Sequence, residues 1–443
     1  MIMRRIELKR GRALDTADLR RDGGVDPEVL SVAARIVEDV RERGDEAVRE
    51  YTQRFDGPDL DVLRVTSAEI ETAVASVSDE FKDALAAAAS SIEEFHERQL
   101  PQSWFDAREG GVFVGQKVTP LRRVGIYVPG GRACYPSSVL MNAIPAVVAG
   151  VDEIAMVVPP AADGSVNPYV LAAAAEVGVS EIYKVGGAQA IAALAFGTAS
   201  IPRVDKITGP GNAYVVAAKK LVVGDVGIDM LAGPSEICVL ADETAEPAFV
   251  AIDLMAQAEH DPNARAYLVT SDPTLPDEVE EALDVLLAEA PRADVIRRSL
   301  TDNGLVVVVE DESAAIDVAN AIAPEHLEIM MAEPFELLGH VRNAGAIFLG
   351  PWTPESVGDY VAGPNHVLPT GGTARFSGPL SVDDFVKKSS VISYSRAALE
   401  TDAATVIALA TAEGLDAHAD AVVLRLELAE EMDAEAGAGP GEA

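Results

Sequence analysis

Hydrophobic residues recur at spacings of three and four positions in two long stretches near the N-terminus, residues 26–55 and 67–99. This spacing places the apolar side chains on one face of a helix, so we expect amphipathic helices in both stretches. Pro27 stands where a first helical turn would begin, a position that tolerates proline. After the polar stretch 101–111 the pattern changes to short apolar runs.

These short runs alternate with alanine-rich helical stretches. Strands are predicted at 124–128, 153–158, 181–185 and 206–208, and helices at 169–177, 188–196 and 213–222. A second series predicts strands at 237–241, 266–270 and 305–309, with helices at 249–259 and 277–289. Strand and helix in alternation indicate parallel α/β units. We therefore expect an α/β fold with two Rossmann-like parallel-sheet domains, plus small N- and C-terminal helical segments.

Domain boundaries follow from these changes of pattern. The predicted parts are an N-terminal extension 1–24, a first α/β domain from 25–118 with 237–380, a second from 119–236, a C-terminal domain 381–433, and a tail 434–443. The C-terminal domain begins near a basic, β-branched patch. The tail is rich in Gly, Ala and Glu and has no aromatic residue, so we expect it to be disordered.

Four glycine-rich segments border the predicted strands, at 128–131, 185–189, 207–212 and 231–236. In a parallel sheet such segments lie at the carboxyl ends of strands, where open α/β folds bind ligands. The dinucleotide fingerprint GxGxxG is absent, because its nearest match has Tyr214 in place of the third glycine. A nucleotide would have to be held in another way.

The charge restricts the partners. The chain has 72 acidic and 35 basic residues, a net charge of −37, which argues against nucleic acid or an anionic membrane as a partner. Residues 119–240 contain nine acids and eight bases, so almost all of the excess lies elsewhere. This segment is either more buried or receives an anionic ligand, and the two are compatible. Only nine cations are lysine and alanine is abundant, which suggests a halophilic source with a salty cytoplasm.

Cysteine usage and the N-terminus indicate a reduced, cytoplasmic setting. Cys134 and Cys238 form no CxxC pair, so neither a disulfide framework nor a thiolate zinc knuckle is expected, and we interpret both as small buried residues. The basic N-terminus has no apolar run behind it, so no signal peptide is predicted. Proline, asparagine and glycine interrupt the longest uncharged stretch, which argues against a membrane span.

Two histidines stand beside other chemically useful side chains. Gln257 and His260 are three positions apart at the end of a helical pattern and would share a face, which could be half of a metal site. The alternative is a surface helix end with a polar pair. Glu325 and His326 follow Pro324, so we expect them at the start of a helix, offering two bases of different strength. The alternative is a helix-start glutamate with an incidental histidine.

The other histidines carry less information. His366 lies in a turn-rich loop, an unusual place for a histidine between apolar neighbours unless it binds something, and the sequence assigns it no role. His96 and His340 lie in charged helical contexts and are predicted at the surface. His418 and Asp359 indicate nothing by themselves.

Taken together, these segments resemble the histidinol dehydrogenases. The segments that carry the resemblance are YVPGG (127–131), YPSSVLM (135–141), GGAQAI (186–191), GPGN (209–212), DMLAGPSE (229–236), QAEHD (257–261), PEHLE (324–328), GDY (358–360), NHVLP (365–369) and EGLDAH (413–418). They occur in order over most of the chain.

The resemblance implies a zinc-dependent oxidation of L-histidinol to L-histidine through the aldehyde, with two NAD⁺, at the end of histidine biosynthesis. It makes Glu325 and His326 the catalytic bases. The implied zinc ligands, one ion per subunit, are Gln257, His260, Asp359 and His418. The implied substrate contacts are these ligands with Ser235, His326 and Glu413. The implied NAD contacts are Tyr127, Gln189 and Asn212. It also implies a homodimer in which Glu413 and His418 come from the partner chain.

The implied roles agree with the chemistry of the reaction. His326 would take the alcohol proton in the first oxidation, and Glu325 would activate the water that hydrates the aldehyde before the second. Two other classes remain open: a metal-dependent hydrolase, which would need a similar metal site but no dinucleotide, and a metabolite-binding paralogue, which should have lost Glu325 or His326.

Overall fold

The computed structural model describes the chain except for residues 1, 10–13, 20–23, 131–133 and 438–443. It divides into two compact units. Unit 1 comprises Met1–Leu100 and Leu121–Phe385, and unit 2 comprises Pro101–Pro120 and Val386–Ala443.

Unit 1 contains a five-stranded sheet in the order β6-β5-β4-β7-β8, with every pairing parallel. Its strands are β4 (Arg123–Tyr127), β5 (Glu153–Val158), β6 (Glu181–Lys184), β7 (Lys206–Thr208) and β8 (Gly227–Ile228). The helices of this part are α5 (Pro136–Ala149), α6 (Pro168–Glu176), α7 (Gly187–Phe196) and α8 (Ala213–Leu221). Every residue of β4 is buried, as expected for a central parallel strand covered on both faces.

Unit 1 also contains a six-stranded parallel sheet in the order β1-β11-β10-β9-β12-β13. Its strands are β1 (Arg4–Glu7), β9 (Glu236–Ala241), β10 (Arg265–Thr270), β11 (Leu305–Val308), β12 (His326–Met330) and β13 (Ala346–Leu349). The helices are α9 (Pro247–Ala258), α10 (Leu275–Glu289), α11 (Ala293–Asn303), α12 (Glu312–Ile322), α13 (Pro334–Leu338) and α14 (Glu355–Tyr360). Alternate residues of β9 pack into two different cores, Ile237 with α9, α10 and α11, and Cys238 with α12.

The two sheets share one topology. Apart from the additional edge strand β1, each sheet places its first strand in the centre, two later strands on one side and two on the other. The strand order therefore reverses between β4 and β7 in one sheet and between β9 and β12 in the other. The predicted fold class, with two Rossmann-like parallel sheets, is confirmed.

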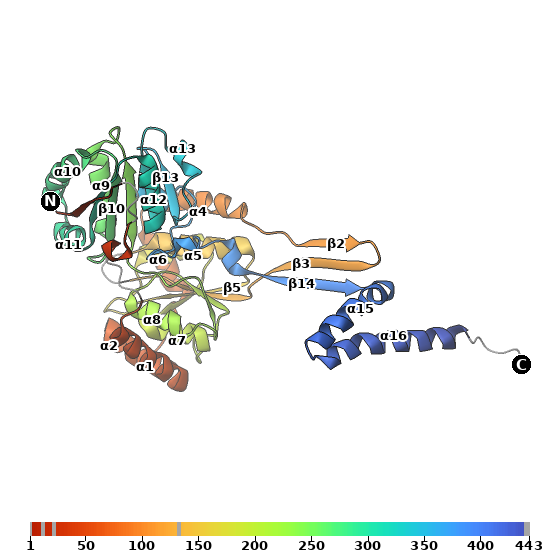
Figure 1. Ribbon diagram of the computed structural model, residues 1–443. Coiled ribbons are helices and arrows are strands. Elements are labelled where there is room, and N and C mark those ends of the chain that lie inside the picture. The colour runs from red at the N-terminus through yellow and green to blue at the C-terminus, as the bar shows by residue number, and fades with distance from the viewer. Residues whose placement is uncertain (1, 10–13, 20–23, 131–133, 438–443) are drawn as a thin grey trace, which may run out of the picture. The chain divides into compact units, whose positions relative to one another are not determined.

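The N-terminal helices pack differently from the predicted grouping of 25–118 with 237–380. These helices are α1 (Pro27–Arg43), α2 (Asp45–Asp56), α3 (Ser67–Ser76) and α4 (Asp79–Glu97). Ile36 and Val40 of α1 join the core of the five-stranded sheet, where α1 and α2 lie beside α7 and α8 (Figure 1). Helices α3 and α4 contact α5 and α6. Amphipathic spacing shows that a helix face is buried but does not identify the sheet that buries it.

The two chain ends also differ from their predictions. Within the predicted extension 1–24, β1 pairs with β11 and so belongs to the six-stranded sheet. Residues 10–13 and 20–23 of this extension lie outside the described part. At the other end, residues 434–437 of the predicted disordered tail continue a helix, whereas 438–443 are not described.

Unit 2 contains a three-stranded antiparallel sheet and two helices. The strands are β2 (Trp104–Arg108), β3 (Val112–Pro120) and β14 (Val386–Tyr394), in the order β14-β3-β2, and the helices are α15 (Arg396–Ala412) and α16 (Asp416–Gly437). The predicted C-terminal domain 381–433 therefore lacked β2 and β3. Three short 3-10 helices in unit 1 complete the described elements: η1 (Thr16–Leu19), η2 (Thr373–Arg375) and η3 (Val382–Phe385).

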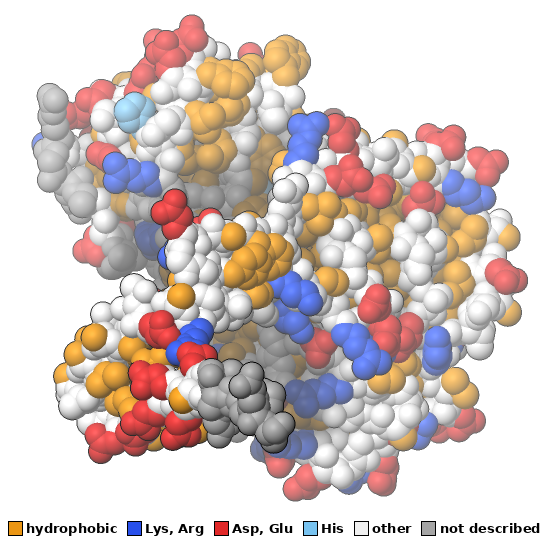
Figure 2. All heavy atoms as spheres, turned by 90° about the vertical axis from the view of Figure 1, so that its right-hand side faces the viewer, with side chains coloured by type: hydrophobic (Ala, Val, Ile, Leu, Met, Phe, Trp, Pro, Cys, Tyr) orange, Lys and Arg blue, Asp and Glu red, His pale blue; other side chains and the backbone are white. Residues whose placement is uncertain are grey.

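The surface carries both charge and apolar groups. Figure 2 shows hydrophobic side chains at the surface among acidic and basic ones. In unit 2 the large exposed apolar side chains include Trp104, Phe105, Ile392, Leu409 and Met432. None of the described helices combines the length and the apolar composition that a membrane crossing would need.

Candidate active site

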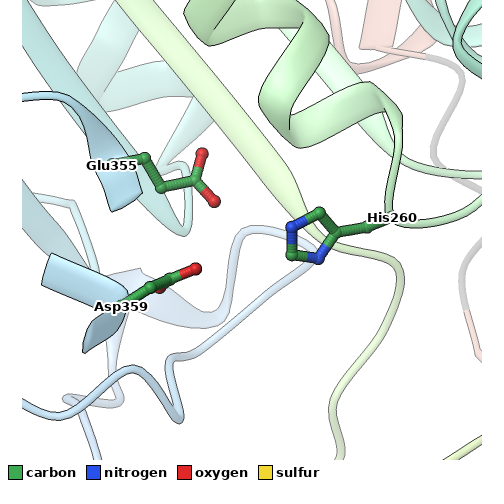
Figure 3. Close-up of side chains that lie close together, drawn as sticks. All are labelled: His260, Glu355 and Asp359. Atoms are coloured by element: carbon green, nitrogen blue, oxygen red, sulfur yellow. The ribbon is translucent and has the colours of Figure 1, made fainter. Parts of the chain in front are cut away.

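Three side chains of unit 1 converge in an arrangement that could hold a metal ion. One ligand atom each of His260, Glu355 and Asp359 lies within 4.8 Å of the others. His260 follows the end of α9, and the two carboxylates project from successive turns of α14 toward its ring (Figure 3). Since residues four apart on a helix share a face, a short helix is enough to direct both carboxylates to one point.

Gln257 lies in the last turn of α9 and is fully buried. Its side-chain amide is 3.0 Å from Nδ1 of His326, so one helix end supplies both Gln257 and His260 to the same region. Glu413 and His418, also predicted at the site, belong to unit 2, where both are exposed, Glu413 at the C-terminal cap of α15 and His418 in the first turn of α16.

The prediction that Glu325 and His326 open a helix is wrong. His326 is the first residue of strand β12 and pairs with Ile237 of β9. The alternation of Leu327 and Ile329, both fully buried, is the strand pattern that outweighs the helix-start signal of Pro324. Strand β12 lies between β9 and β13, and at its start Glu325 and His326 are buried, with only 6% and 4% of their surface exposed.

His326 is held as a neutral imidazole. Nδ1 lies 3.1 Å from the carbonyl oxygen of Glu236 and 3.6 Å from a carboxylate oxygen of Glu355. Nε2 has no hydrogen-bond partner among the described residues. Burial lowers the pKa of His326 to about 3, because removal from water disfavours the charged ring. The ring is therefore unprotonated at neutral pH, and the same burial makes it a weaker base than an exposed imidazole.

Burial shifts the pKa of the carboxyl groups in the opposite direction. The Glu325 carboxylate accepts a hydrogen bond from the Glu236 backbone N–H at 2.8 Å and another from Ser235, yet burial raises its pKa well above the usual value. Burial likewise raises the pKa of Glu355, and it raises that of Asp359 to about 6. Several buried acids that resist ionisation in one place are typical of a functional site.

The three residues implied to contact NAD meet at the carboxyl edge of the five-stranded sheet. Tyr127 ends β4, and its hydroxyl accepts a hydrogen bond from the Gly187 N–H at 3.1 Å. Gln189 is buried in the first turn of α7, and neither atom of its amide group has a partner in the described chain. Asn212 caps α8 by accepting hydrogen bonds from two backbone N–H groups.

One of the four glycine-rich segments is not at a carboxyl edge. Residues 231–236 lead into β9, so Ser235 and Glu236 lie at the amino end of that strand. Glu325 and His326 are likewise at the amino end of the adjacent β12. The candidate bases are thus positioned at the reversal point of the six-stranded sheet but at the opposite end from the one expected for open α/β folds.

Comparison with known proteins identifies the family. A model of the histidinol dehydrogenase family matches residues 19–426. The chain belongs to this family. The histidinol dehydrogenase of Halalkalibacterium halodurans is 55% identical over 415 residues, covering 93% of this chain and 98% of the relative. That of Heliobacterium mobile is 56% identical over 404 residues, covering 91% and 95%. The crystal structure of histidinol dehydrogenase from Elizabethkingia anophelis superposes with a TM-score of 0.91 at 36% identity, covering 97% and 99%.

As a member of the histidinol dehydrogenase family, the chain is an enzyme of the dehydrogenase class. The alternative of a metal-dependent hydrolase is therefore wrong. The shared fold over almost the whole of both chains also agrees with the observed pair of parallel sheets.

Several residues at the site were given no role by sequence reasoning. Glu355 was missed, although its spacing of four from Asp359 was a usable signal. His366 approaches Asp359, because its Nδ1 lies 3.1 Å from the Asp359 carbonyl oxygen, and burial lowers the pKa of His366 to about 4. Glu328 accepts a hydrogen bond from the Glu355 N–H at 2.8 Å and so holds the start of α14.

Two minor predictions also differ from the structure. His96, predicted at the surface, is fully buried, with Nδ1 2.8 Å from the Ile92 carbonyl oxygen. His340 is exposed, as predicted. Cys238 is buried as predicted, whereas Cys134 is only half-buried.

Proposed function

We propose that the protein oxidises L-histidinol to L-histidine through L-histidinaldehyde, with two NAD⁺ and one zinc ion per subunit, as the last steps of histidine biosynthesis. The observation that carries this proposal is the buried, neutral His326, whose Nε2 is unpartnered in the described chain, beside Glu325 and the His260, Glu355 and Asp359 group.

The donor set fits zinc. Imidazole nitrogen and carboxylate oxygen are ordinary zinc ligands, and a divalent cation would compensate buried carboxylates whose ionisation burial now disfavours. We assign Gln257, His260 and Asp359 as ligands, with His418 from the partner chain. When bound, zinc supplies a fixed positive charge that can orient the imidazole and amine of the substrate.

Residues of the chain could also bind the dinucleotide. The Gln189 amide is buried and has no partner among the described residues, which is costly unless a ligand supplies one. We assign Tyr127, Gln189 and Asn212 as its contacts, within the segment 119–240 that carries little net charge. When bound, NAD⁺ accepts hydride from the carbinol carbon.

The chain itself handles the protons. We assign His326 the tautomer with the proton on Nδ1, which lies 3.1 Å from the Glu236 carbonyl oxygen, so that the lone pair of Nε2 takes the proton of the substrate alcohol. Glu325, held by the Glu236 N–H, takes a proton from the water that hydrates the aldehyde. Ser235 and Glu413 are assigned to the substrate. The hydration step thus has a base of its own, whereas His326 is the base closest to the reacting oxygen in both oxidations.

We further propose a cytoplasmic homodimer with shared sites. Glu413 and His418 are exposed in unit 2, which also exposes large apolar side chains such as Phe105 and Leu409. Apolar groups of this kind at the surface are typical of subunit interfaces.

The test is NADH formation from L-histidinol, followed by absorbance, with a chelator control and zinc restoration. We expect two NADH for each L-histidine formed, and loss of activity with the chelator that zinc reverses. Absence of NADH with zinc restored, or one NADH per product, would contradict the proposal.

A further inference from the structure

A buried ion pair outside the proposed chemistry holds the loop that follows β7. Lys219, in the last turn of α8, pairs with Asp229, which follows β8, and their side chains are only 3% and 1% exposed. Removing two charges from water carries a penalty that their attraction does not always repay. Such a pair therefore indicates a specific role when the other hydrogen bonds of its two side chains are all made to one backbone segment.

These hydrogen bonds converge on Gly209. The Lys219 ammonium donates to the Gly209 carbonyl oxygen at 2.9 Å, and the Gly209 N–H donates to Asp229 Oδ2 at 2.8 Å. Asp229 Oδ1 accepts from Lys219 and, at 2.6 Å, from the Met230 N–H. Both backbone polar groups of Gly209 are thus fixed by the two members of one ion pair.

Gly209 in turn lies against a residue assigned to the dinucleotide. Its φ is +112°, and a side-chain carbon there would lie 2.2 Å from the carbonyl oxygen of Tyr127. Two residues beyond Gly211, the helix α8 begins after its cap Asn212, and a side-chain carbon on Gly211 would lie 2.3 Å from a methyl carbon of Val215. The backbone of 209–212 therefore packs tightly between the end of β4 and the start of α8.

We propose that Lys219 and Asp229 are positioning residues for the dinucleotide. By holding Gly209 against the backbone of Tyr127, the pair sets the separation and direction of the Tyr127 and Asn212 side chains. A GxGxxG loop obtains its shape from its glycines and the following helix, whereas here a side-chain ion pair performs that task. The inference rests on the proposed use of NAD⁺.

A neutral side chain at position 219 would disrupt this arrangement. Lys219→Met replaces the side chain by an unbranched, uncharged one that is one atom shorter, and it leaves the Gly209 carbonyl oxygen and the Asp229 carboxylate without the Lys219 ammonium. The double variant Lys219→Met with Asp229→Asn removes both charges, so no buried charge is left uncompensated and folding is less at risk. Lys220→Met is the matched control, because Lys220 is the adjacent residue and is exposed.

The experiment measures NADH binding by fluorescence titration of the full-length protein without histidinol, and kcat and KM for each substrate. We expect Kd for NADH and KM for NAD⁺ to rise about tenfold in Lys219→Met and in the double variant, the effect of losing a buried hydrogen bond from a ligand-holding loop. We expect kcat at saturating NAD⁺, KM for histidinol and bound zinc to stay within about twofold, and Lys220→Met to match the wild type.

Other results would overturn the inference. An unchanged Kd in a folded variant, or an equal loss of kcat, zinc and histidinol affinity, would make the pair purely structural. The same conclusion would follow if Lys219→Met and the double variant both failed to fold while Lys220→Met folded. If the wild type itself binds no NADH, the proposed function fails, which is a distinct result.

Discussion

Glu325 and His326 are neighbours in the chain, and the same burial shifts their pKa in opposite directions. Loss of water disfavours the charged form of each group, so the pKa of the carboxyl rises and that of the imidazole falls. Side by side, they provide a neutral imidazole and a carboxyl group that is a stronger base than an exposed one. This difference suits two proton transfers of different difficulty.

Separate substitutions should separate the two oxidations. We expect His326→Asn to slow NADH formation from histidinol and from supplied histidinaldehyde by about 10²- to 10⁴-fold, the usual contribution of a positioned base. Glu325→Gln should slow mainly the oxidation of the aldehyde, because it removes the base for hydration. The measurement is single-turnover NADH formation from each substrate. Equal effects of Glu325→Gln on both would contradict the division of roles.

Asp56 should make stability depend on pH. It is the last residue of α2, its Oδ2 is buried without a partner in the described chain, and burial raises its pKa from 3.8 to about 6. The folded protein therefore binds this proton more tightly than the unfolded chain, so Asp56 lowers stability as pH rises from about 4 through 6.

The variant Asp56→Asn should remove this penalty. We expect it to raise the free energy of unfolding by about 1–2 kcal/mol at pH 8, after allowance for solvent screening, and by much less at pH 4.5. Urea titrations of the protein without cofactor at both pH values measure the difference. An equal increase in the free energy of unfolding at pH 4.5 and at pH 8 would show that the ionisation of the Asp56 carboxyl group is not the cause.

At the scale of elements, α14 and the start of β12 determine the site. Helix α14 has only six residues, yet it supplies both Glu355 and Asp359, and its first N–H group is held by Glu328 of β12. A strand that is paired on both sides in a parallel sheet thus fixes the helix that carries two of the three converging groups. The strand and the helix end of α9 are rigid supports, which a metal site requires.

Glu355 should therefore support the metal although the family resemblance does not name it as a ligand. We expect Glu355→Gln to weaken zinc binding about 10- to 100-fold, the range for a group that orients or charges a metal site. Chelator competition gives the affinity without reference to activity. The control is Glu336→Gln on α13, which is exposed. Equal zinc affinity in both variants would exclude this role.

The wrong prediction of a helix start at 324–328 also concerns a secondary-structure element. Proline followed by charged residues is a helix-start signal, and the residues that contradict it, Leu327 and Ile329, form too short an alternation to decide alone. The partner strand β9, whose residues lie 89 positions before their partners in β12, settles it by pairing with β12. Pairing between distant segments is not encoded in local periodicity.

For the molecule as a whole, the charge of −37 is the property to test. We interpret it as adaptation to salty surroundings, since dense carboxylates repel one another at low ionic strength and are screened in salt. We expect the midpoint of thermal unfolding to rise from dilute buffer to 2 M KCl, and activity to rise with it. Equal stability and activity in both conditions would refute the halophilic interpretation.

The sequence by itself determined the α/β class, the strands β4 to β7 and β9 to β11, and the glycine-rich segments that follow β4, β6 and β7, because local periodicity and residue type carry that information. The expected site residues came from the family resemblance. Only the tertiary structure decided that α1 and α2 cover the five-stranded sheet, that residues 101–120 join unit 2, and that Glu355 and His366 lie beside Asp359. These facts depend on which distant surfaces bury one another. The net charge of −37 follows from the sequence alone and concerns the solvation of the surface. The positions of Glu325 and His326 depend instead on the packing of helices against the sheets.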